Sequence, residues 1–149
     1  MKLIKILLSG FTALCLLAGC ESDLDIHNLS SESSFVAPVL NQPGEIKVTS
    51  DMIENEAEIS FGWTKADFGQ PVEIVYNINA SYNGKSTVLF AKLNGSSYSV
   101  KCPELAEKLL NLGIPAGQTV TMTMNIDCTI GSDFKTLKSA DKTISVFVE

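Results

Sequence analysis

The fold of this chain is decided by residues 72–102, which read VEIVYNINASYNGKSTVLFAKLNGSSYSVKC. In Val72–Tyr82 apolar side chains alternate with polar ones, which is the period of a half-buried strand. Asn83-Gly84 and Asn94-Gly95 each supply a two-residue turn of the kind that matches the twist of paired strands. The segments that follow these turns read as strands: Ser86–Leu93 and Ser97–Cys102. The stretch therefore predicts three consecutive antiparallel strands.

The same alternation continues on both sides of this stretch. Glu45–Ser50 and Ala57–Trp63 predict strands before it, and Thr119–Ile130 predicts a long strand after it. The last strand holds three apolar residues in register: Ile144, Val146 and Val148.

One helix interrupts the strands after Cys102. Pro103 suits the first helical position, Glu104 favours the positive end of the helix dipole, and Gly113 can cap the C-terminus. Three leucines line one face of this helix: Leu105, Leu109 and Leu112.

Residues 35–149 thus predict an all-β domain with about seven short strands and one short helix. This pattern is typical of a β-sandwich of the immunoglobulin or fibronectin type III kind. A small barrel is the alternative fold.

The N-terminus indicates export and lipid attachment. Lys2 and Lys5 precede a short apolar run, and Leu17-Ala18-Gly19-Cys20 closes it. A charged start, an apolar core and small residues at the boundary define a signal peptide, which we place at residues 1–19. The four closing residues resemble a bacterial lipobox, so Cys20 is the expected site of lipid attachment.

Residues 20–34 are polar, acidic and rich in serine, which predicts a lipidated tether in front of the domain. By composition the tether reads as a solvated spacer. Its acids, which include Glu21 and Asp23, resemble the signal that sends some lipoproteins to the outer face of the outer membrane. We therefore expect a lipid-anchored protein of the outer membrane, exposed at the cell surface.

The composition excludes several functions. The net charge is −6, and the chain contains no arginine, so bidentate contacts to phosphate or guanine are unavailable and we expect no nucleic-acid partner. No Cys or His spacing suggests a zinc site, and we expect no metal and no cofactor. The lone His27 precedes the domain, so a Ser-His or Cys-His catalytic pair cannot be built there, and we expect no enzyme and no catalytic residue.

Few residues are candidates for ligand contact. Trp63 could stack on a sugar, but its alternation with Ile59 and Phe61 favours a place in the core. Phe68 and Phe134 lie in predicted loops, where we expect them to be freer to be exposed, and they are the weak candidates for ligand binding.

Cys102 and Cys128 lie on the apolar faces of two predicted strands. They can form a disulfide in an oxidising compartment or remain buried thiols, and we favour the unbridged state.

Several segments in this order resemble the N-terminal domain of the SusE family, outer-membrane starch-binding lipoproteins. They are Ser34–Leu40 (SFVAPVL), Ile59–Gly69 (ISFGWTKADFG), the strand Val72–Tyr82, and Glu104–Gly117 (ELAEKLLNLGIPAG). The resemblance implies an immunoglobulin-like module at the cell surface, beside a TonB-dependent importer and its lid lipoprotein. In the family this module is followed by carbohydrate-binding domains. We expect them to be absent here, because the chain ends at Glu149, and no sugar-binding residue is carried over.

Three hypotheses follow from the residues and the resemblance. The first is a non-catalytic spacer or assembly module of a Sus-type polysaccharide uptake system. The second is a small surface protein that binds a starch-type glycan with the sandwich loops around Phe68 and Phe134. The third is a lipoprotein of unrelated role that shares only the sandwich.

Overall fold

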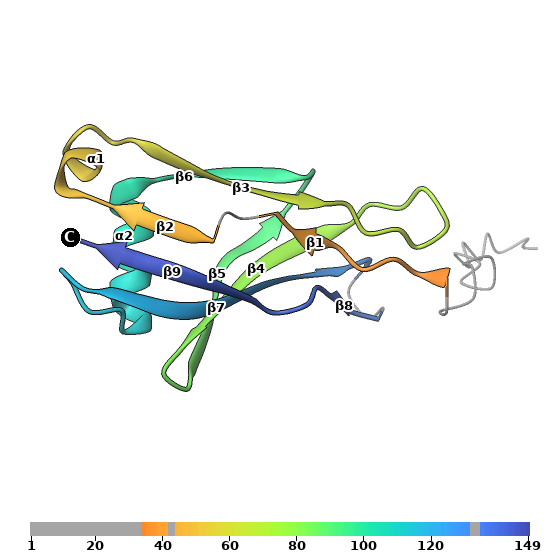
Figure 1. The fold of residues 1–149 in the computed structure, drawn as a ribbon. Coiled ribbons are helices and arrows are strands. Elements are labelled where there is room, and N and C mark those ends of the chain that lie inside the picture. Colours follow the sequence, from red (N-terminus) through yellow and green to blue (C-terminus); the bar gives the residue numbers. More distant parts are fainter. Residues whose placement is uncertain (1–33, 42–43, 132–134) are drawn as a thin grey trace, which may run out of the picture.

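The computed structural model describes residues 34–41, 44–131 and 135–149, which form two β-sheets packed face to face (Figure 1). The expected lipidation site Cys20 and the candidate Phe134 lie outside the described residues. The predicted all-β sandwich is confirmed. Within the described ranges no helix is long and apolar enough to cross a membrane.

The smaller sheet has three antiparallel strands in the order β1-β3-β6. Its central strand β3 (Glu58–Thr64) pairs with β1 (Val39–Leu40) on one side and with β6 (Ser97–Lys101) on the other. A further antiparallel bridge between Val36 and Asp67 extends the β1–β3 pairing beyond the sheet.

The larger sheet has the order β2-β9-β7-β4-β5, and a short strand β8 also pairs with β7. The strands are β2 (Glu45–Val48), β9 (Lys142–Val148), β7 (Thr119–Thr129), β4 (Val75–Tyr82), β5 (Lys85–Leu93) and β8 (Leu137–Lys138). All neighbours are antiparallel except β2 and β9, which run parallel. The N-terminal part of the chain therefore contributes β1 to one sheet and β2 to the other.

The predicted helix is present as α2 (Cys102–Leu112), with Pro103 in its first turn. Gly113 ends it in the left-handed conformation (φ 106°), and its N–H bonds the carbonyls of Leu109 and Leu110. Glycine adopts this conformation without a Cβ penalty, which is why it commonly follows a helix. In Figure 1, α2 lies at the end of the sandwich near the C-terminus.

A second helix, α1 (Ser50–Glu54), was not expected, so the prediction of one helix is wrong. It replaces the end of the first predicted strand, which stops at Val48. The helix is five residues long and fully buries none of its side chains, so it leaves no apolar periodicity in the sequence. Its first N–H group, from Ser50, donates to Oε2 of Glu149 at 2.8 Å, a contact that only the folded chain provides.

The two Asn-Gly turns behave differently. Asn83 (φ 47°) and Gly84 (φ 79°) both have positive φ, as the hairpin turn requires, and they join β4 to β5 as predicted. At Asn94-Gly95 only the glycine has positive φ (83°), and the next strand, β6, pairs with β3 in the other sheet. The prediction that the third strand pairs next to the second is therefore wrong, because the second turn carries the chain from the larger sheet to the smaller one.

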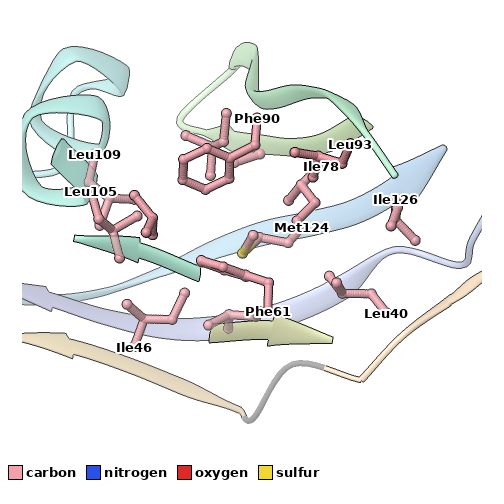
Figure 2. Packing of buried hydrophobic residues seen from close by; sticks show 14 of the residues in the cluster. Leu40, Ile46, Phe61, Ile78, Phe90, Leu93, Leu105, Leu109, Met124 and Ile126 are labelled. Carbon is pink, nitrogen blue, oxygen red and sulfur yellow. The ribbon is translucent and has the colours of Figure 1, made fainter. Parts of the chain in front are cut away.

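The core fills the space between the sheets and is closed at one end by α2 (Figure 2). Side chains from both sheets and from the helix converge there: Leu40, Ile46, Phe61, Ile78, Phe90, Leu105, Leu109, Met124 and Ile126. Trp63 belongs to this core with 3% of its surface exposed, which confirms its predicted burial.

Candidate functional site

The structure places Phe68 in the core, so its expected exposure is wrong. The loop that carries it folds back onto the N-terminal segment, where Val36 and Asp67 exchange backbone hydrogen bonds of 2.8 and 2.9 Å. The Phe68 ring is fully buried and lies 5.1 Å, between centroids, from that of Phe35. Phe68 therefore cannot meet a ligand in this conformation, and Phe134 lies outside the described residues.

The other aromatic side chains of the described ranges offer no open platform either. Four of them are partly buried: Phe35, Tyr82, Tyr98 and Phe147. The remaining ones are buried: Phe61, Trp63, Tyr76 and Phe90.

Trp63 and Tyr76 support the fold from opposite sheets. Their ring centroids lie 5.4 Å apart, and the Tyr76 hydroxyl accepts a 3.0 Å hydrogen bond from the backbone N–H of Ala66. Burial raises the pKa of Tyr76 above its ordinary value. This hydroxyl holds the segment after β3 in place, so its role is structural.

A polar network crosses the outer face of the larger sheet. The Asn77 side-chain amide donates to Oδ1 of Asp127 at 2.8 Å, and the Asn79 amide donates to its Oδ2 at 2.6 Å. Asn79 also donates to Oδ1 of Asn125 at 3.1 Å. Both carboxylate oxygens of Asp127 are thus held by amides from the neighbouring strand β4.

The network continues toward strand β8. The Asn125 amide donates to Oδ1 of Asp141 at 2.9 Å, and Nζ of Lys138 lies 3.4 Å from the same oxygen. Asn125 itself is almost fully buried although it faces the outer side of the sheet. Its burial is tolerated because its amide is hydrogen-bonded on both sides.

A trough of about 560 Å³ lies over this network. Its lining includes Asn79, Ser86, Val88, Asn125, Asp127 and Asp141. A row of small hydroxyl side chains crosses the same face, because strand register aligns Thr143, Thr123, Ser81 and Ser86. The trough therefore presents hydroxyl, amide and carboxylate groups in fixed positions.

A second groove of about 490 Å³ lies between β5 and α2. Lys85 lines it from the strand, and Lys108, Asn111 and Leu112 line it from the helix. Lys108 also lies over the ring of Phe90, 5.4 Å from its centroid. The two hollows share Ser86, Thr87 and Val88, so they lie on either side of the same strand.

The alternation in the sequence is enough to put the residues of the network on the polar faces of two strands, but it does not connect them. Asn77 and Asn79 alternate on β4, as Asn125 and Asp127 do on β7. The signal that could have identified the site is a pair of Asn or Asp residues at alternate positions, present in each of two strands. It becomes specific only with the register, which sets Asn77 opposite Asp127.

Cys102 and Cys128 are buried free thiols, as expected. Burial raises the pKa of Cys102 above its ordinary value and that of Cys128 to about 11. The thiolate is the reactive form, so Cys128 stays protonated and inert at neutral pH. In the part of the chain that the structure describes, no three His, Cys, Asp or Glu residues gather to hold a metal ion.

Comparison with known proteins gives one family. A family model described as SusE outer membrane protein matches residues 22–127 of this chain. No curated protein matches it. Among solved structures, that of murine CRIg is similar, with 10% sequence identity and a TM-score of 0.37. The match covers 75% of this chain and 98% of the CRIg chain.

Proposed function

Because this chain belongs to the SusE family of outer membrane proteins, we propose that its sandwich is a non-catalytic spacer or assembly module of a Sus-type polysaccharide uptake system. It acts at the cell surface, beside a TonB-dependent importer and its lid lipoprotein. Cys20, which closes the Leu17-Ala18-Gly19-Cys20 motif, carries the lipid that holds it to the outer membrane.

The burial of the aromatic side chains is the observation that carries this proposal. Sugar sites combine a concave surface with apolar or aromatic faces and a few convergent polar groups. In the described ranges the largest aromatic side chains, Trp63 and Tyr76 among them, are buried in the core. This burial favours a module that positions or assembles other proteins over one that binds a glycan tightly.

Co-isolation from intact cells tests the assembly role. The chain carries an affinity tag at its C-terminus, the cells are cross-linked, and the membranes are then solubilised. We expect the importer and its lid lipoprotein to be recovered in fixed proportion to the tagged chain. A matched control is the Cys20→Ala chain, which would lack the anchor and lose this recovery. Recovery of neither protein from cells that produce the anchored chain would overturn the proposal.

The polar trough favours a second candidate function, binding of a glycan on the outer face of the larger sheet. Its amides and carboxylates are already held by hydrogen bonds, for example Asn79 to Asp127. Binding a sugar would therefore cost little side-chain entropy. Calorimetry against soluble starch and a panel of other polysaccharides decides between the two. The spacer role predicts no binding tighter than millimolar. Micromolar binding that Asp127→Ala abolishes would replace it with the glycan role.

A further inference from the structure

Among the described residues, strand β5 is an outer strand of the larger sheet, with β4 on one side and no further strand paired on the other. The first four residues of β5, Lys85 to Val88, are all exposed. An outer strand of this kind presents a row of main-chain N–H and C=O groups to which another chain can pair.

Register shows which groups of β5 face outward. Tyr82 and Lys85 flank the two-residue turn, so their main chains bond each other, and the pattern then alternates along the strand. Thr87 faces Ala80 of β4 in the same way. The main-chain groups of Ser86 and Val88 consequently point away from the sheet.

The two hollows described above flank this edge. The groove against α2 lies on one side of Lys85–Val88, and the trough over the polar network lies on the other. Alternate side chains of an added strand point to opposite faces, so each hollow would receive every second side chain. Proteins that bind an extended peptide at a sheet edge combine main-chain hydrogen bonds with pockets for alternate side chains.

The charges of the two hollows differ. The groove against α2 contains Lys85 and Lys108, and the exposed Glu104 lies 3.8 Å from Lys108. An exposed pair at that distance is weak and leaves Lys108 available to a closer carboxylate. Across the strand, Asp127 is held by amides and Asp141 by Lys138. Acid side chains are therefore favoured toward α2, and hydroxyl or amide side chains toward the trough.

We infer that an extended segment of a partner protein, with acidic residues at alternate positions, adds to the outer edge of β5 along Lys85–Val88. The bonds run from the main chain of Ser86 and Val88, and the acidic side chains enter the groove beside α2. This inference names the partner class for the proposed assembly role and rests on that role.

The added strand is short because β5 does not stay regular. The register of β5 against β4 shifts twice between Leu93 and Val88, and Lys92 has a positive φ of 58°. Bulges bend and twist an edge strand and stop further pairing. The pairing surface therefore ends at Val88.

A second copy of this chain fits the edge less well. Antiparallel pairing of two β5 strands about Thr87 would set Val88 opposite Ser86 and Lys85 opposite Leu89. No acidic side chain would then meet Lys85, so the positive charge of the groove beside α2 would stay without a complement. Charge complementarity thus favours a different, acidic partner segment.

Defined peptides test the inference without the uptake system. The probes are Thr-Glu repeated four times, Thr-Lys repeated four times, and the Thr-Glu peptide methylated at every amide nitrogen. Each is titrated by fluorescence anisotropy into the chain purified from outer membranes in detergent. We expect the Thr-Glu peptide to bind about tenfold more tightly than the Thr-Lys peptide, and the methylated peptide not to bind.

Residue-resolved hydrogen exchange locates the binding. The amides of Ser86 and Val88 should exchange more slowly with the Thr-Glu peptide, whereas the Thr87 amide, already bonded to β4, should change little. Protection elsewhere, or equal binding of all three peptides, would overturn the inference. If the chain alone sediments as a dimer that excess peptide does not dissociate, the edge belongs to a second copy and the inference is wrong.

Two variants separate the edge from the fold. Val88→Pro removes an outward N–H that β4 does not use, and it should abolish peptide binding while the thermal midpoint stays near that of the parent. Lys85→Glu with Lys108→Glu should reverse the preference between the two charged peptides. Lys47→Glu on the opposite edge strand β2 is the matched control and should leave both affinities unchanged. Co-isolation of the importer remains a separate readout, so loss of peptide binding with co-isolation intact counts against the inference alone.

Discussion

The side-chain amide of Asn79 lies 2.6 Å from Oδ2 of Asp127, and this contact joins the polar faces of strands β4 and β7. Register does not pair these two residues directly, since Asn79 lies opposite Asn125. The contact is therefore a diagonal one, and it ties together two rows of the sheet. It also leaves both oxygens of a half-buried carboxylate hydrogen-bonded.

Asn79→Ala should destabilise the fold by about 1–3 kcal/mol, because it removes a hydrogen bond to a charged group and leaves Asp127 short of a partner. Urea unfolding followed by tryptophan fluorescence measures the change. Ser86→Ala, in the same trough but exposed, is the control and should stay within about 0.5 kcal/mol of the parent. Equal effects of the two substitutions would show that the network contributes little.

Trp63→Ala should cost about 3–5 kcal/mol, as large aromatic truncations in cores do. Trp63→Phe is the matched control and should cost much less. The Trp63 Nε1 group is buried with no hydrogen-bond partner among the described residues, so phenylalanine forfeits no polar contact there. The measurement is chemical unfolding followed by circular dichroism. A Trp63→Ala chain as stable as the parent, but with altered ligand binding, would move Trp63 to a binding site.

Cys128 should make stability fall with pH at alkaline values. Its pKa is raised from the ordinary value of 9.0 to about 11 by burial, so between these values the folded state binds more protons than the unfolded state. Stability from this thiol is complete below pH 9 and is lost as pH rises toward 11. The urea midpoint of Cys128→Ala should therefore fall less over this window than that of the parent. Parallel curves for the two chains would contradict the burial of the thiol.

Cys20→Ala should abolish lipid attachment. Labelled palmitate should enter the parent chain and not the variant, because the thiol that closes the lipobox is gone. Cys15→Ala, which alters a cysteine inside the signal peptide, is the control and should keep the label. Label that persists in the Cys20 variant would make the lipobox interpretation wrong.

Local patterns predicted much of this fold correctly. Alternation placed Phe61 and Trp63 on the buried face of β3, and the same period described β4 and β7. Pro103 and Gly113 bounded α2 almost to the residue. Each of these features depends on side chains within one turn or one strand, which is why neighbours in the chain suffice to predict them.

The candidate site was harder to predict. Phe68 stands in a loop between Lys65 and Gly69, a setting that usually indicates exposure, yet it packs on Phe35 from the far N-terminal segment. In the sequence Asn79 and Asp127 are only two of the polar residues that alternate with apolar ones. Their contact spans 48 residues of sequence, and nothing local to either residue indicates its partner.

The sequence by itself determined the strand periods, the hairpin at Asn83-Gly84, the helix after Cys102 and the burial of Trp63, because propensity, turn geometry and capping act between near neighbours. Only the tertiary structure decided that β6 joins β3, that Phe68 is buried, and that Glu149 meets the first residue of α1. It also decided that Asn79 and Asp127 share one network. These outcomes depend on which segments pack side by side, and that choice is made by the free energy of the whole core, to which every strand contributes.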